Sequence, residues 1–244
     1  MPGGRRSTTR PAIISAECTR AIGWALPILR ALQDCPSLAA KHSQWRTLDL
    51  SDLAFAIETR VRALAELPEE IDVSLRLLVG EFEADCRRDK FIERGRVPPG
   101  VAYPFENLTA VRRVRTGAVS FIVECQSLLE NLVRFDQRFH RYYLKQQMSK
   151  NQSRKRLVQF SGDASISQQI ETWRNDLLHF RAPFLEFEVN ESEPRYRARL
   201  CLDWRPGSRD CMMLEQLLTM QSTLLKAAVQ LQQDLTAKVR RLCR

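Results

Sequence analysis

The chain has 244 residues, of which 44% are hydrophobic and 27% charged, the composition of a globular protein long enough to bury a sizeable core. The net charge is +9, which indicates an acidic partner, with nucleic acid as the first candidate and a membrane surface as the second. Nine glycines and eleven prolines are too few for a turn-rich all-β fold, and the longest apolar run, residues 21–29, is too short to span a bilayer.

The cysteines and histidines argue against metal chemistry. There are seven cysteines, an odd number, with irregular spacing and no CxxC pair. This pattern argues against a disulfide framework and a zinc site, and predicts reduced thiols in a cytoplasmic protein. With only three histidines, a His-based metal cluster is also not expected. The sequence therefore predicts no metal and no cofactor.

The N-terminal part of the chain reads as a basic arm followed by helices. Residues 1–11 are basic and Ser/Thr-rich, which predicts a disordered arm, with a transit peptide as the alternative. Helical periodicity predicts helices over residues 12–33, bent at Pro27, and over residues 51–66. Pro68, followed by two glutamates, predicts the start of another helix that runs to about residue 93. The Pro/Gly segment 95–104 is the expected boundary between an N-terminal helical region, residues 12–100, and a second domain, residues 101–244.

The second domain is predicted to be helical with one small β-hairpin. Residues 106–148 read as one continuous helix with Gly117 as its weak point. At 1.5 Å per residue such a helix is about 60 Å long, so other helices must cover it in an elongated bundle. Residues 149–156 read as a polar, basic loop, and helices are expected over residues 165–181 and 210–242. The last helix carries leucines that suit either the core or a dimer interface.

Between the last two helices the hydrophobic period changes from 3.6 to 2. Apolar and charged residues alternate over residues 184–189 and again over residues 195–204. This alternation predicts a β-hairpin over about residues 184–204 with one buried face. The glutamates of the first strand are expected to face the arginines of the second.

The segment ETWRNDLLHFRAPF, residues 171–184, carries the candidate chemistry. On a helical wheel one apolar face is predicted to pack in the core, and its residues are Ile166, Ile170, Trp173, Leu177 and Phe180. Asn175 and His179 are four residues apart and share the opposite face, with Arg174 on the flank. Leu178 is an apolar residue beside this polar trio, which indicates that the outer face meets another helix or subunit.

The order R-N-D-L-L-H resembles the R-x4-6-H signature of HEPN domains. A long helix before the motif, a hairpin after it and a last helix are also similar to that family, over about residues 106–244. The resemblance implies an all-α bundle that commonly dimerises, and an activity as a metal-independent ribonuclease, often a toxin or defence effector. By position, it makes Arg174 and His179 the catalytic pair and Asn175 the residue that orients them. Toxins silenced by adenylylation have a tyrosine two residues after the histidine. Here Arg181 stands at that place, which puts this control in doubt and makes Arg181 a candidate phosphate contact.

These residue types suit RNA cleavage without a metal. A histidine can exchange a proton near neutral pH, so His179 could deprotonate the ribose 2′-OH or protonate the 5′-oxygen. The forked donors of Arg174 could stabilise charge on the phosphorane, leaving a 2′,3′-cyclic phosphate. An acid on the long helix, Glu124 or Glu130, is a candidate to orient Arg174, and the sequence does not choose between them.

A basic stretch leads from the long helix toward the motif and predicts an RNA track. Its candidate RNA-binding residues, besides Arg181, are Arg141, Lys145, Lys150, Arg154, Lys155 and Arg156. The sequence thus predicts a mainly α, HEPN-like ribonuclease that is cytoplasmic and binds RNA but no membrane. It is expected to be a homodimer through the face of the motif helix, with a cognate antitoxin or regulatory protein as a further partner. The alternative is a non-catalytic helical scaffold that binds RNA or protein, in which His179 is only a solvated side chain.

Overall fold

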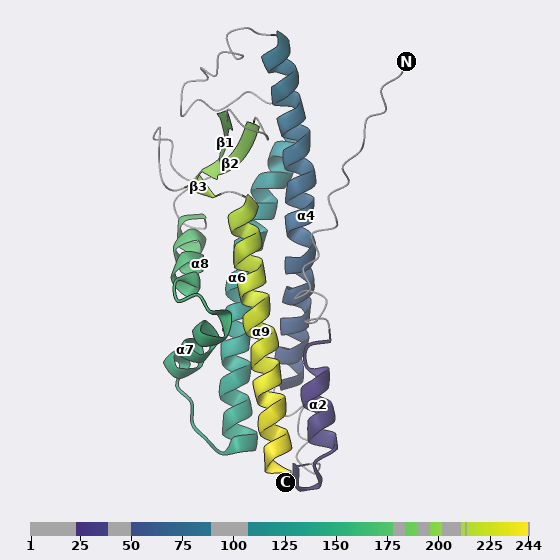
Figure 1. Ribbon diagram of the computed structural model, residues 1–244, viewed down its shortest axis with the longest axis vertical. Coiled ribbons are helices and arrows are strands. Elements are labelled where there is room, and N and C mark those ends of the chain that lie inside the picture. The colour runs from purple at the N-terminus through teal and green to yellow at the C-terminus, as the bar shows by residue number, and fades with distance from the viewer. Residues whose placement is uncertain are drawn as a thin grey trace.

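The protein is a helical bundle. The structure, a computed structural model, describes residues 23–38, 50–88, 107–177, 184–189, 196–201, 211–212 and 214–243. Within these ranges seven helices form an elongated bundle, with three short strands at one end (Figure 1). The prediction of a mainly α bundle is therefore confirmed. Among the helices so described, none has the length and apolar character needed to cross a membrane.

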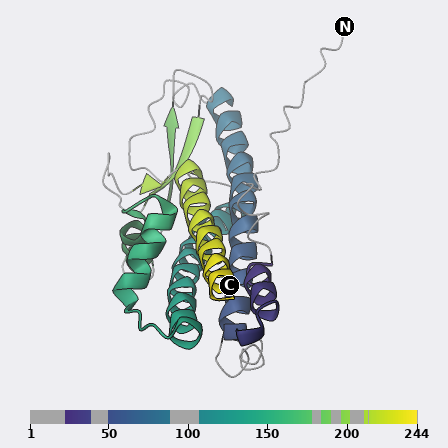
Figure 2. The same cartoon turned by 60° about the horizontal axis from the view of Figure 1, so that its bottom comes forward.

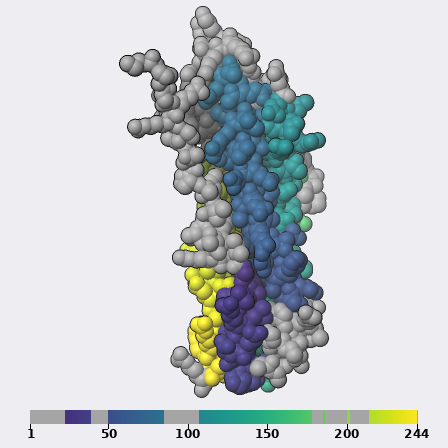
Figure 3. All heavy atoms as spheres, turned by 90° about the vertical axis from the view of Figure 1, so that its right-hand side faces the viewer, coloured from purple at the N-terminus to yellow at the C-terminus, as the bar shows by residue number. Residues whose placement is uncertain are grey.

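Three long helices form the body of the bundle. They are α4 (Leu50–Arg88), α6 (Leu108–Phe139) and α9 (Leu214–Leu242), and they run side by side along the length of the molecule (Figures 1 and 2). The short helix α2 (Leu26–Gln33) packs against the C-terminal part of α9. Figure 3 shows the face on which α2 and α4 are exposed.

One hydrophobic core joins the N-terminal helices to the rest of the chain. Trp24, just before α2, is fully buried, and its ring meets that of Phe135 from α6 edge to face at a centroid distance of 4.7 Å. Its indole Nε1 also donates a hydrogen bond of 2.7 Å to the carbonyl oxygen of Ala228 in α9. The segment predicted as a domain boundary, residues 95–104, lies outside the described residues.

Helix α4 continues through Pro68, where the sequence predicts a break between two helices. That expectation is wrong, and the reason is a hydrogen bond from another helix. A proline has no N–H, so inside a helix it leaves the carbonyl four residues earlier without its usual donor. Here that carbonyl belongs to Leu64, and the buried side-chain amide of Gln221 in α9 donates to it. The backbone of α4 can therefore stay helical across the proline.

This contact predicts that Gln221 and Pro68 are energetically coupled. Gln221→Leu should lower the free energy of unfolding by about 1–3 kcal/mol, because it leaves the buried Leu64 carbonyl without a donor. Pro68→Ala restores an N–H at position 68, so it should recover most of this loss in the Gln221→Leu background. Urea unfolding of the two single variants and the double variant measures the coupling. An equal effect of Pro68→Ala in both backgrounds would contradict it.

Helix α6 is shorter than the predicted helix over residues 106–148. Its N-cap, Asn107, accepts a hydrogen bond of 3.1 Å from the backbone N–H of Ala110. Gly117 is not a weak point but a contact point, since a Cβ there would lie 2.8 Å from Cγ1 of Ile71 in α4. The absence of a side chain thus lets α4 and α6 approach closely.

The predicted continuous helix ends in a π-helical turn, η1 (His140–Leu144). The next residue, Lys145, has a left-handed backbone with φ 52°, which reverses the chain direction. The N–H of Gln146 then donates to the carbonyl of His140 at 3.1 Å and closes the turn. The expectation of an unbroken helix to residue 148 is therefore wrong.

Residues 149–156 were expected to form a loop, but most of them belong to helix α7 (Lys150–Ser161). A reciprocal capping box starts the helix, in which Ser149 Oγ accepts from the N–H of Gln152 and Gln152 Oε1 accepts from the N–H of Ser149. Such a box satisfies two otherwise unpaired donors. Most of the polar residues that suggested a loop are exposed, while Ser153 and Leu157 are buried. Gly162, at φ 76°, ends the helix.

Helix α8 (Ile166–Asn175) packs on α6, and three strands follow it. Strand β1 (Phe184–Val189) pairs antiparallel with β2 (Tyr196–Cys201), and β3 (Cys211–Met212) pairs with the end of β2. The register places each glutamate of β1 opposite an arginine of β2. The residues that connect β1 to β2 lie outside the described ranges, so the turn of the expected hairpin stays a prediction.

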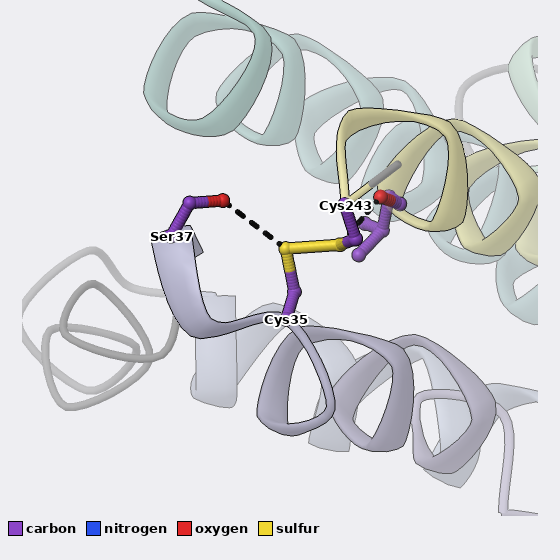
Figure 4. The surroundings of a disulfide bond; sticks show 4 residues. Cys35, Ser37 and Cys243 are labelled. Atoms are coloured by element: carbon purple, nitrogen blue, oxygen red, sulfur yellow. Dashed lines mark hydrogen bonds between the residues drawn. A yellow bond between two sulfur atoms is a disulfide. The ribbon is translucent and has the colours of Figure 1, made fainter.

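A disulfide between Cys35 and Cys243 overturns the expectation of reduced thiols. Cys35 follows α2 and Cys243 follows α9, and their Cα atoms are 5.3 Å apart although 208 residues separate them in the sequence (Figure 4). Cys201 is also disulfide-bonded, whereas Cys125 is a buried thiol whose pKa is raised by its burial. Disulfides are typical of oxidising compartments. The disulfides do not favour the predicted cytoplasmic location, which stays a prediction.

The Cys35–Cys243 bond should stabilise the packing of α2 on α9. The double variant Cys35→Ser/Cys243→Ser is expected to lose about 2–5 kcal/mol of unfolding free energy relative to the oxidised protein, because the bond closes a long loop in the unfolded chain. Denaturant unfolding with and without a reducing agent measures this. Equal stability of the double variant and the oxidised protein would show that the bond contributes nothing.

Candidate functional site

The first part of the predicted motif lies at the end of α8. Arg174 is partly buried in the last turn, and its Nη1 donates to Oδ1 of Asn175 at 3.3 Å. On the other side of the helix Ile166 and Ile170 are buried. Trp173 and Leu177 pack partly buried against the same core. The predicted core face of α8 is thus confirmed for its described residues, and it fixes the helix that carries Arg174.

The rest of the motif is not described. Residues 178–183, which include Leu178, His179, Phe180 and Arg181, lie outside the described ranges, so the geometry of the catalytic pair stays a prediction. The two acids proposed to orient Arg174 have other partners. Glu124 accepts two hydrogen bonds from Arg60 Nη1, at 2.7 and 2.9 Å, and Glu130 accepts one from Gln126 Nε2 at 2.8 Å.

The predicted RNA track lies on η1, the turn after it and α7. Arg141, Lys145, Lys150 and Lys155 are exposed there, and Arg154 is half-buried. Their side chains therefore meet solvent along one continuous segment of the chain. No contact links Arg174 to any of them within the described ranges, so the structure does not join the described part of the motif to the track.

Arg156 differs from the other residues of the track because it holds three helices together. Its Nη1 donates to Oδ1 of Asp136 in α6, and its Nη2 donates to Oδ2 of Asp234 in α9, both at 2.5 Å. The Asp136 side chain is fully buried and that of Arg156 is 18% exposed. The guanidinium also lies 5.5 Å from the centre of the Phe160 ring. The role of Arg156 in RNA binding stays a prediction, but its charge is already matched inside the protein.

His140 also belongs to this network. It is 2% exposed, and its Nδ1 lies 2.9 Å from the carbonyl oxygen of Asp136 and 3.2 Å from Oδ1 of the same residue. Its Nε2 lies 3.3 Å from Arg156 Nη1 and 3.2 Å from Lys238 Nζ. Both cations can only donate, so Nε2 accepts and Nδ1 carries the proton that it donates to Asp136. Asp136 thus orients the ring, and Nε2 faces the two cations.

This network borders a cleft of about 620 Å³ between η1, α7 and α9, which we call the His140 cleft. The residues that line it are His140, Gln146, Gln147, Met148, Gln152, Lys155, Arg156, Gln159 and Lys238. Lys238 also pairs with Asp234 at 2.9 Å. The pairs Asp136–His140 and Asp234–Lys238 each have a spacing of four residues, which is visible in the sequence. That these pairs meet at Arg156 is not visible there.

In the parts of the chain that the structure describes, no group of three or more His, Cys, Asp or Glu side chains gathers to hold a metal ion. Comparisons of the chain with protein-family models, curated proteins and solved structures found no match. The likeness of the motif to HEPN domains therefore stays a prediction from the sequence.

The electrostatics of the network follow from the position of Asp136. Burial alone would raise the pKa of its carboxyl, but the hydrogen bond from His140 and the positive charge of Arg156 outweigh burial. The pKa of Asp136 is therefore lower than its usual value, and the folded state favours the ionised form. The stability this provides is present above the pKa of the unfolded chain and is lost as the pH falls through the lower folded value.

Asp136→Asn is expected to lower the unfolding free energy by about 3–5 kcal/mol at neutral pH, because it leaves the charge of Arg156 without its buried partner. The difference from the wild type should persist down to about pH 4, the ordinary range of a carboxylate, and shrink below it. Urea unfolding between pH 7 and pH 3 measures both, with the exposed Glu171→Gln on α8 as a control. A difference that stays constant down to pH 3 would contradict the lowered pKa.

Proposed function

We propose that the protein is a metal-independent endoribonuclease of HEPN type, a toxin or defence effector, with Arg174, Asn175 and His179 as its site. The observation that supports this most is the hydrogen bond from Arg174 to Asn175 at the end of a helix anchored in the core. Held in this way, the guanidinium loses less conformational freedom when it binds a phosphate. The exposed cations on η1, the turn after it and α7 favour a polyanionic substrate.

In this proposal the RNA supplies its own nucleophile. His179 takes the proton of a ribose 2′-OH, and the 2′-oxygen attacks the adjacent phosphorus. The bond from phosphorus to the 5′-oxygen breaks, and that oxygen receives a proton, leaving a 2′,3′-cyclic phosphate and a 5′-hydroxyl. Arg174 stabilises the charge on the phosphorane oxygens, and Asn175 holds Arg174 in place. In a homodimer through the motif-helix face, the second His179 would supply the proton to the leaving group.

The alternative is a non-catalytic helical protein that binds RNA. It is favoured by the exposed lysines at positions 145, 150 and 155, which suit phosphate contacts whether or not cleavage follows. The two candidates differ in what His179 does. Catalysis needs this side chain, whereas binding through the lysines does not.

Incubation of the purified protein with end-labelled RNAs of varied sequence in excess EDTA tests the proposal. His179→Ala should lower the cleavage rate by about 10²–10⁴-fold, the usual contribution of a general acid or base. Arg174→Lys should also lower it, because an ammonium group cannot bind phosphate with two parallel donors. Thr172→Ala, on the exposed side of the same helix, should cleave like the wild type and serves as the matched control.

The product ends should carry 2′,3′-cyclic phosphates. Helical content measured by circular dichroism should be equal in all four proteins, which separates lost chemistry from lost folding. No cleavage of any RNA, or equal cleavage by the wild type and His179→Ala, would refute the ribonuclease and leave the binding protein.

A further inference from the structure

We infer that the His140 cleft is a binding site for the phosphate group of a nucleotide, separate from the motif on α8. The cleft is formed by η1, α7 and α9, none of which carries Arg174 or Asn175. The inference rests on the geometry of the cleft and does not require that the protein cleaves RNA.

The first argument is the charge of the cleft. Three cations, Lys155, Arg156 and Lys238, line it, and two carboxylates, Asp136 and Asp234, balance part of their charge from behind. The surplus is positive. Lys155 is exposed and has no ion-pair partner among the residues that the structure describes. An anion in the cleft would therefore find a cation that is not yet neutralised.

The second argument is that Lys238 is held ready for an anion. Its ammonium group carries three N–H donors. Contacts to Asp234 Oδ2 at 2.9 Å and His140 Nε2 at 3.2 Å account for two of them. His140 can hold the ammonium group in this way because Asp136 fixes its ring with Nε2 toward the cleft. His140 is thus a positioning residue for Lys238.

The third argument is the shape and lining of the cleft. A volume of about 620 Å³ lies within the usual range for small-molecule sites, and it exceeds what a bare phosphate needs. Four glutamines line the cleft beside the cations. Amide side chains can pair with the edges of nucleobases as well as with phosphate oxygens. The lining therefore fits a nucleotide better than inorganic phosphate alone.

The backbone around His140 supports a binding role. The residue begins a π-helical turn, and Lys145 directly after the turn has a left-handed backbone that is rare for a residue other than glycine. Both features cost free energy and are concentrated at functional sites. Gln146, Gln147 and Met148, which follow this turn, line the cleft.

The nucleotide could be free or part of an RNA strand, because both present the same phosphate chemistry. Calorimetric titrations with adenosine 5′-monophosphate and with a short single-stranded RNA distinguish the two sources. The RNA titration uses the full-length His179→Ala protein, so that cleavage at the α8 motif does not interfere. Displacement of the mononucleotide by RNA indicates a strand-binding subsite, and its absence indicates a site for free nucleotides.

Two charge reversals provide a matched pair. Lys155→Glu places a negative charge in the cleft, whereas Lys226→Glu makes the same charge change at an exposed residue of α9 that does not line it. Lys155→Glu should weaken mononucleotide binding at least tenfold at constant salt, and Lys226→Glu should change it less than twofold. In a footprint by acetylation, the mononucleotide should protect Lys155 and Lys238 but not Lys150, which is exposed on the same helix as Lys155.

Absence of mononucleotide and RNA binding would overturn the inference. Equal losses in the two charge-reversal variants would also overturn it, because they would show only general attraction to a basic surface. Neither result bears on cleavage by His179, so failure of this site and failure of the ribonuclease remain distinguishable.

Discussion

The arrangement of the C-terminal half depends on the burial of one carboxylate. Asp136 lies within the core face of α6 with a fully buried side chain, and a buried charge is tolerated only when it is paired and hydrogen-bonded. Arg156 and His140 meet this requirement at Oδ1, and in doing so they fix α7 and the start of η1 against α6. Arg156 then pairs with Asp234, which extends the same constraint to α9. The His140 cleft is the outer side of this network.

A second set of contacts, made by α9 and the residue that follows it, also holds the N-terminal helices. Gln221 supplies the donor that Pro68 cannot provide to Leu64, while Gln232 donates to the carbonyl of Trp24. The disulfide from Cys243 then ties the end of α9 to the segment after α2. The buried carbonyls of Trp24 and Leu64 are thus satisfied by side chains of α9, within one core that spans both regions.

The two candidate sites differ in what supports them. The motif on α8 is suggested by the sequence and receives one contact from the structure, between Arg174 and Asn175. The cleft is suggested by the structure, through the mutual placement of His140, Lys155 and Lys238. If both proposals hold, the exposed lysines of α7 would lie on a surface that binds RNA phosphates, with chemistry confined to the end of α8.

The sequence by itself determined the features that depend on near neighbours in the chain. Hydrophobic periodicity predicted the helical class, the last helix and the core face of α8, because amphipathic patterns repeat within a few residues. The Ser149–Gln152 capping box is equally local, and its spacing could have revealed α7 within the stretch expected to be a loop.

Only the tertiary structure decided the features that join distant parts of the chain. Leu64 and Gln221 are 157 residues apart, so a local rule about proline wrongly predicted a helix break that a remote amide prevents. Cys35 and Cys243 pair only because α2 packs on α9. The pairs Asp136–His140 and Asp234–Lys238 have readable spacing, but their meeting at Arg156 depends on which faces of α6, α7 and α9 pack together. Packing of helices far apart in sequence thus created the His140 cleft, and no periodicity within one helix contains that information.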